Sequence, residues 1–132
     1  MNDPVNHPSH YTAHPICEAI DICEHLSFNL GNAVKYLWRA GKKEDFAEDI
    51  KKAAFYLRRE FQLKDGDVVF PREIKSLAKV LVRHPATDAI VRDILACSLD
   101  GVSVQAACAI AYAACGARIN ASLPAIGSFD KI

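Results

Sequence analysis

Apolar residues recur every three to four positions along much of the chain, which is the spacing of an amphipathic helix. One such pattern runs from about Gly31 to Ala40, and a longer one runs from about Glu44 to Leu63. Gly41 lies between them, and glycine is common just after a helix ends. Because the break is short, we predict that the two helices pack as an antiparallel hairpin. The longer helix is expected to bury Phe46, Ile50, Ala53, Leu57 and Phe61.

An earlier helix is predicted to begin after Pro15 and to run to about Leu26, because proline is favoured at the start of a helix. Its apolar positions are Ile16, Ala19, Ile20 and Cys23. The residues from Phe28 to Leu30 are interpreted as a short join to the next helix.

Three more helices are predicted in the second half of the chain. They run from Pro71 to His84, from about Ala86 to Ser98, and from Val104 to about Asn120. A turn at Asp100-Gly101 and a cap at Ser103 precede the last one. No segment alternates as a strand would, so the predicted fold is all-α. It consists of a helical hairpin core with an extended N-terminal loop and additional C-terminal helices. Residues 1–63 and 64–132 are expected to form two regions, the second packed on the first or forming oligomers.

Pro4, Pro8 and Pro15 prevent a continuous helix at the start of the chain and favour extended backbone. Three histidines lie in this segment, His7, His10 and His14. They are open to three interpretations: metal ligation, a loop that covers a ligand pocket, or local packing. The second is preferred, because the usual zinc spacing is absent.

Sixteen basic residues balance sixteen acidic ones, which argues against a coat for duplex nucleic acid. The five cysteines are an odd number without C-x-x-C spacing, as expected of reduced core thiols in a cytosolic protein. The longest apolar run, residues 102–119, is too short and too weak to span a bilayer. No membrane partner is therefore expected, and the predicted location is cytoplasmic.

The last predicted helix consists mostly of alanine. Small side chains let helix axes approach closely, so this helix is either a buried central helix or a subunit contact. We prefer the second interpretation and expect a homo-oligomer.

The polar faces of the hairpin carry the candidate chemistry. Cations at Lys35, Arg39 and Lys52 can hold phosphate, arginine through a fork and lysine as a point charge. The neighbouring carboxylates of Glu48 and Asp49 are hard oxygen ligands of the kind that Mg²⁺ prefers. Ordinary surface ion pairs between the same residues are the simpler alternative, and spacing alone favours them. The sequence contains no glycine-rich phosphate loop.

Four segments resemble a widespread family of small phage proteins of unknown function. They are Asp3-Pro4-Val5-Asn6-His7-Pro8-Ser9-His10-Tyr11, Glu18-Ala19-Ile20-Asp21, Gly31-Asn32-Ala33-Val34-Lys35-Tyr36-Leu37-Trp38-Arg39, and Glu48-Asp49-Ile50-Lys51-Lys52-Ala53 with Tyr56-Leu57. The resemblance covers about residues 3–60. One group of that family is similar to the unconventional nucleotide kinase of short-tailed coliphages, which phosphorylates deoxynucleoside monophosphates without a phosphate loop.

The resemblance implies a magnesium-dependent nucleotide kinase in the cytoplasm of an infected bacterial host. Its matched positions imply a nucleotide site at His10, Tyr11, Asn32, Lys35, Tyr36, Arg39 and Lys52. Arg39, Lys35 and Asp49 would be catalytic, and Glu48 and Asp49 would hold the metal. Phosphoryl transfer needs chiefly positioning and charge stabilisation, which such residues can supply.

Two other functions are considered. Glu18-x-x-Asp21 and Asp45-x-x-Glu48 are loosely similar to the paired acidic motifs of all-α nucleoside triphosphate pyrophosphatases. A non-enzymatic protein could instead sequester a nucleotide signal of host defence. Turnover of nucleotide distinguishes the enzymes from the binding protein.

Overall fold

A computed structural model describes residues 5–6, 14–40, 46–63, 74–101 and 103–122. Within these residues the secondary structure is helical and contains no strand, which confirms the predicted all-α fold. The helices are α2 (Ala19–Cys23), α3 (Phe28–Arg39), α4 (Phe46–Leu63), α5 (Lys75–Arg83), α6 (Ala89–Leu99) and α7 (Val104–Ser122).

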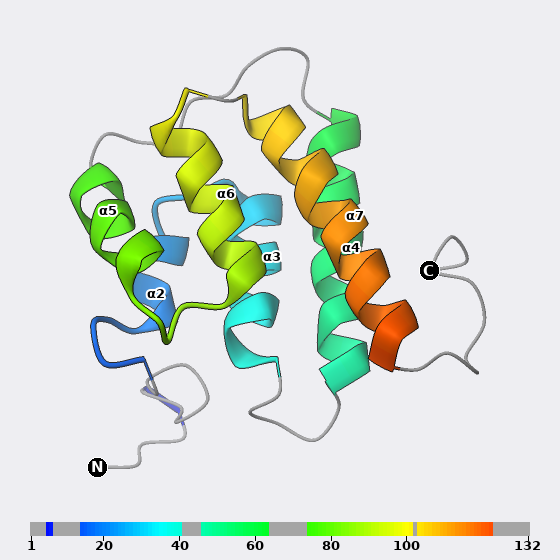
Figure 1. The fold of residues 1–132 in the computed structure, drawn as a ribbon, viewed down its shortest axis with the longest axis horizontal. Helices are drawn as coiled ribbons and strands as arrows, with labels where there is room; N and C mark the ends of the chain where they lie inside the picture. The colour runs from blue at the N-terminus through cyan, green and yellow to red at the C-terminus, as the bar shows by residue number, and fades with distance from the viewer. Residues whose placement is uncertain (1–4, 7–13, 41–45, 64–73, 102, 123–132) are drawn as a thin grey trace.

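The predicted hairpin is present: α3 and α4 lie side by side and run in opposite directions (Figure 1). Helix α4 also packs against α7, which again runs antiparallel to it. Helix α6 contacts both α7 and α3, α5 packs on α6, and α2 packs on α3. One hydrophobic cluster therefore joins helices from both halves of the chain.

The start of α3 differs from the prediction. The helix begins at Phe28, so the interpretation of residues 28–30 as a join was wrong. Ser27 is its N-cap, and the Ser27 hydroxyl accepts a hydrogen bond from the Leu30 amide at 3.2 Å. That bond satisfies one of the backbone donors that a helix start leaves without a partner.

Helix α2 is shorter than predicted and begins later. Glu18 is its N-cap, and the Glu18 amide donates a hydrogen bond to the Asp21 carboxylate at 2.9 Å. This capping box starts the helix at Ala19 rather than after Pro15. The buried face is also different: Ile22 is fully buried, whereas Ile20 is 63% exposed.

The apolar face of α4 is largely as predicted. Ile50, Ala53 and Leu57 are completely buried. Phe61 was expected to be buried but is 51% exposed, and Phe46 is only half-buried against the core. Burial in α4 is thus concentrated in its central turns.

The end of α5 and both bounds of α6 and α7 agree with the prediction to within a few residues, and the predicted start at Pro71 lies outside the described residues. Helix α5 starts at Lys75 and α6 at Ala89, where the Asp88 carboxylate caps the amides of Ile90 and Val91. The predicted turn before α7 contains Gly101 at a φ of 80°, in the left-handed region that favours glycine. The predicted cap is confirmed, because the Ser103 hydroxyl accepts a hydrogen bond from the Ala106 amide at 3.1 Å.

Helix α7 is partly a central helix and partly a surface helix. Its inner side, including Cys108, Ala111 and Cys115, is buried against its neighbours. Its outer side, including Ala113 and Ile110, is exposed. No helix among the described residues is long and apolar enough to cross a membrane.

Candidate functional site

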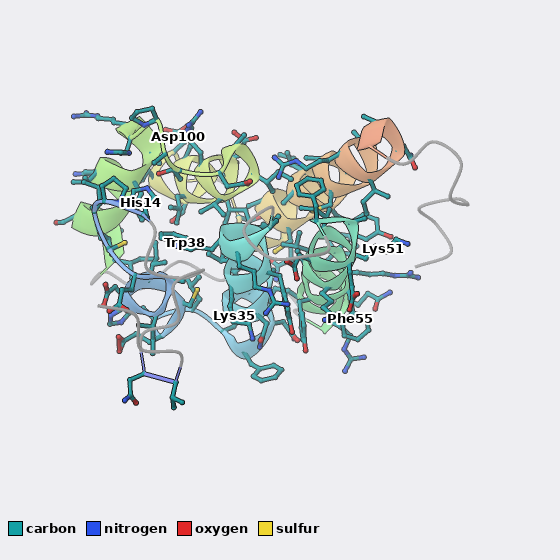
Figure 2. All side chains as sticks on the ribbon, turned by 90° about the horizontal axis from the view of Figure 1, so that it is seen from below. His14, Lys35, Trp38, Lys51, Phe55 and Asp100 are labelled. Carbon is teal, nitrogen blue, oxygen red and sulfur yellow. The ribbon has the colours of Figure 1, made fainter. Side chains whose placement is uncertain are left out.

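Three cations surround one aromatic ring on the face shared by α3 and α4. The Lys35 ammonium lies 4.6 Å from the centroid of the Tyr36 ring, the Lys52 ammonium 5.4 Å, and the Arg39 guanidinium carbon 5.1 Å. Tyr56 of α4 stacks on Tyr36 with a centroid distance of 6.0 Å and an interplanar angle of 8°. We call Lys35, Tyr36, Arg39, Lys52 and Tyr56 the cation–tyrosine cluster. In Figure 2, the labelled Lys35 lies on this face of α3.

Arg39 is held in place by a carboxylate of the neighbouring helix. Its Nε donates a hydrogen bond to Oδ1 of Asp49 at 2.9 Å, and its Nη2 lies 2.9 Å from the same oxygen. The Asp49 side chain is only 3% exposed and that of Arg39 is 18% exposed. This ion pair therefore joins α3 to α4 at the border of the core rather than in open solvent.

The second ion pair of the cluster lies on the surface of α4. Lys52 Nζ is 3.0 Å from Oε1 of Glu48, one turn earlier in the same helix. This hydrogen bond raises the pKa of Lys52, so its ammonium stays charged at neutral pH. Lys35 forms no salt bridge with a described residue. Three cations thus face two carboxylates, and the charge of Lys35 is available to an anion.

The structure brings together six of the residues singled out from the sequence. They are Lys35, Tyr36, Arg39, Glu48, Asp49 and Lys52. Asn32 lies one turn before Tyr36, where its side-chain amide donates a hydrogen bond to the Phe28 carbonyl at 2.8 Å. His10 and Tyr11 lie outside the described residues, as does Asp45.

The two carboxylates proposed as metal ligands, Glu48 and Asp49, form ion pairs with different cations. Successive helical residues point about 100° apart, since a turn takes 3.6 residues. Accordingly Glu48 is exposed and pairs with Lys52, whereas Asp49 is buried and pairs with Arg39. The described residues contain no group of three or more His, Cys, Asp or Glu side chains able to hold a metal ion. A magnesium site at these two residues stays a prediction.

His14 belongs to the packing of the fold. It is 8% exposed, and its ring lies against Trp38 and His84 at centroid distances of 5.3 and 4.9 Å. Its Nδ1 accepts the Ile16 amide at 3.1 Å, so its Nε2 carries the proton and donates to the Thr87 hydroxyl at 3.0 Å. Local packing is therefore the interpretation that fits His14; His7 and His10 lie outside the described residues.

The cysteines offer no activated nucleophile in this structure. All five are free thiols, and Cys108 and Cys115 are buried. Burial raises the pKa of Cys23, Cys108 and Cys115 to about 12. The reactive form of cysteine is the thiolate, so these three side chains remain in the unreactive form at neutral pH.

Two aromatic residues beside the cluster were missed by the sequence analysis. Phe28 and Phe55 each make an edge-on contact with Tyr56, at centroid distances of 6.0 and 5.2 Å. Ser27, a residue type favoured at the N-cap, was the signal in the sequence that could have shown where α3 begins. A serine cap there starts α3 at Phe28 and places Phe28, Asn32 and Lys35 on one face at helical spacing.

Comparison with known proteins points to the same part of the chain. Residues 5–58, which include the whole cluster, match the model of the family DUF3310, described as a protein of unknown function. The gene 1.7 protein of Enterobacteria phage T3 is 42% identical to this chain over an alignment that covers 42% of this chain and 40% of the phage protein. No solved structure matches. The N-terminal region of this chain is therefore similar to a family of unknown function and to part of a phage protein.

Proposed function

We propose that this protein binds a nucleotide on the α3–α4 face and acts in phage nucleotide metabolism, as a kinase of (deoxy)nucleoside monophosphates without a phosphate loop. The observation that carries the proposal is the cation–tyrosine cluster, in which three cationic groups lie 4.6–5.4 Å from one ring. Side chains from two packed helices supply these charges, which is an alternative to the backbone amides of a phosphate loop.

The cations differ in what they can do for a phosphate. Arg39 is oriented by Asp49, so its guanidinium is held in one place before a ligand arrives. Asp49 is thereby a positioning residue in this proposal. Lys35 is not neutralised by a described carboxylate, and we assign it the strongest direct attraction for an anion.

The proposed reaction moves the terminal phosphoryl group of a nucleoside triphosphate to a phosphate oxygen of a nucleoside monophosphate. The bond between the terminal phosphorus and its bridging oxygen breaks, and its electron pair stays on the departing diphosphate. A new P–O bond forms on the acceptor, so both products are diphosphates. Lys35, Arg39 and Lys52 would stabilise the negative charge on the transferred group.

The alternatives lead to different products. Sequestration of a nucleotide signal would give binding without turnover. A pyrophosphatase would release pyrophosphate, but two of its candidate ligands, Glu18 and Asp21, already form the capping box of α2.

The test compares two lysine variants. Lys35→Gln is expected to weaken nucleotide binding about tenfold, because a charge-assisted hydrogen bond contributes roughly 1.5–3 kcal/mol. Lys79→Gln is the control, since Lys79 is an exposed lysine of α5, a helix that packs on α6 and carries none of the cluster. Binding of the four deoxynucleoside monophosphates is measured by calorimetry, and diphosphate products are followed with ATP, with and without Mg²⁺.

Equal affinities of the wild type and Lys35→Gln would contradict the proposed site. Binding without diphosphate formation would contradict the kinase activity and support sequestration. Release of pyrophosphate from a triphosphate would support the pyrophosphatase instead.

A further inference from the structure

The α3–α4 face has an aromatic end as well as a cationic one. Phe28 is 75% exposed and Phe55 is 52% exposed, and both lie edge-on to the ring of Tyr56. Interplanar angles of 78° and 86° show that the two phenyl rings do not stack on Tyr56. Most of the surface of Phe28 is therefore open to a ligand.

The rings lead from this aromatic end into the cation–tyrosine cluster. Phe28, Tyr56 and Tyr36 follow one another with centroid distances of 6.0 Å at each step. The three cations surround Tyr36, the last ring of the row. Along α3, Phe28 and Arg39 are eleven residues apart, which corresponds to about 16 Å of helix. One surface thus offers flat apolar groups at one end and positive charge at the other.

A nucleotide has the same two-ended chemistry. Its base is a planar π-system that stacks on aromatic side chains without needing specific hydrogen bonds. Its phosphates need cations at a distance from the base. Inorganic phosphate or a sugar phosphate would contact only the cationic end. The aromatic end would therefore give nucleotides a higher affinity than these simpler phosphates.

We infer that Phe28, supported by Phe55, forms the base platform of the nucleotide site, with the base toward the start of α3 and the phosphates toward Arg39. The inference rests on the proposed function and deepens it, because it names the two residues that select a ligand carrying a nucleobase. Tyr56 contacts both phenyl rings through edge-on arrangements. Asn32, between Phe28 and Lys35, is bonded to the Phe28 carbonyl and lies along the same path.

The experiment compares two probes that differ only in the base. Deoxyadenosine monophosphate carries a base, and deoxyribose 5-phosphate does not. Phe28→Leu is expected to lower the affinity for the nucleotide about tenfold, the scale of one base–aromatic stack, and to leave the affinity for the sugar phosphate unchanged. Phe55→Leu should act in the same direction with a smaller loss. Lys35→Gln should weaken both probes.

Phe61→Leu is the control for Phe28→Leu, because Phe61 is 51% exposed but lies in a groove of α4 lined by Arg58 and Tyr112, in which Phe28 takes no part. Circular dichroism and melting curves verify that each variant is folded. Unchanged nucleotide binding in both Phe28→Leu and Phe55→Leu, with Lys35→Gln still weakened, would overturn the base platform and leave the proposed function standing. Failure of the wild type to bind either probe would overturn the proposed function itself.

Discussion

The spacing of Arg39 left two interpretations open, an ion pair with a neighbouring carboxylate and a ligand of phosphate, and its side chain is compatible with both. Two of its nitrogens contact Oδ1 of Asp49, and the other oxygen of that carboxylate, Oδ2, is buried without a hydrogen bond from any described residue. A buried carboxylate depends strongly on its remaining partner, because water is not there to replace it. Removing either partner of the pair should therefore destabilise the fold, and the same guanidinium belongs to the cluster proposed to bind phosphate.

Replacing Arg39 should affect both properties. Arg39→Lys keeps the charge but loses the planar fork, so we expect a decrease of about 1–2 kcal/mol in the free energy of unfolding. Nucleotide affinity should fall about tenfold, because lysine cannot make two parallel charge-assisted bonds. Denaturant unfolding and calorimetric titration measure the two effects.

A double-mutant cycle separates the ion pair from the rest of the site. Arg39→Lys and Asp49→Asn should be non-additive in stability, because each acts on the same contact. Lys52 and Glu48, paired on the surface one turn apart, are the control and should show a coupling of only about 0.3–0.5 kcal/mol. Additive effects for Arg39 and Asp49 would mean that the contact does not stabilise the fold.

At the scale of helices, the sequence predicted the long elements well and the short one poorly. Helices α3 and α4 have twelve and eighteen residues, which make several turns each. Their apolar faces are therefore easy to recognise in the spacing of apolar residues. The five residues of α2 contain little more than one turn, and the capping box of Glu18 and Asp21 determines where it starts. The pattern alone therefore assigned Ile20 to the buried face when Ile22 occupies it.

The candidate site was predictable on each helix but not between helices. Lys35 and Arg39 share a face by spacing, and the approach of Arg39 to the Tyr36 ring follows from its position three residues later in α3. The stacking of Tyr36 on Tyr56 depends instead on how far α4 is shifted along α3. The packing of buried residues such as Leu37 and Leu57 sets that shift. The periodicity of a single helix carries no information about how two helices are shifted along each other.

The link between α3 and α4 extends to the N-cap of α3. Ser27 accepts the Leu30 amide, and its hydroxyl donates a hydrogen bond to Oε1 of the fully buried Glu60 at 2.8 Å. Oε2 of Glu60 has no hydrogen-bond partner among the described residues. Ser27→Ala should therefore lower the free energy of unfolding by about 2–4 kcal/mol, from the lost cap and from the buried carboxyl left without its partner.

Ser103→Ala is the control for the cap alone. Ser103 caps α7 through the Ala106 amide in the same manner, and its loss should cost only about 1 kcal/mol. Both variants are compared by denaturant unfolding. A loss in Ser27→Ala no larger than that in Ser103→Ala would show that Glu60 does not depend on Ser27.

At the scale of the whole molecule, α7 connects the region similar to DUF3310 with the rest of the chain. Its inner side packs against α6 and along α4, which carries two of the five residues of the cation–tyrosine cluster. The C-terminal region thus supports the helix on which the proposed site is built, although it lies outside the family match at residues 5–58.

The outer side of α7 bears on the expected homo-oligomer. Ala109, Ile110, Ala113 and Ala117 are exposed there, and Ile110 is 52% exposed. The helix contains no acidic residue, and its only basic residue, Arg118, pairs with Asp88 at 2.8 Å. Ala111 is 1% exposed and faces the core, so a large residue at that position would test packing within the subunit rather than between subunits.

Ala113→Glu tests whether this outer face joins two copies of the chain. In a two-fold contact the same patch meets itself, so each copy would bring a carboxylate against the other. We expect the mass measured by light scattering to fall to that of the monomer, while helix content stays unchanged because Ala113 is exposed. Ser76→Glu adds the same charge at an exposed position of α5 and should leave the mass of the oligomer intact. A monomeric wild type would contradict the expectation directly. A folded Ala113→Glu variant with unchanged mass would place the contact on another face.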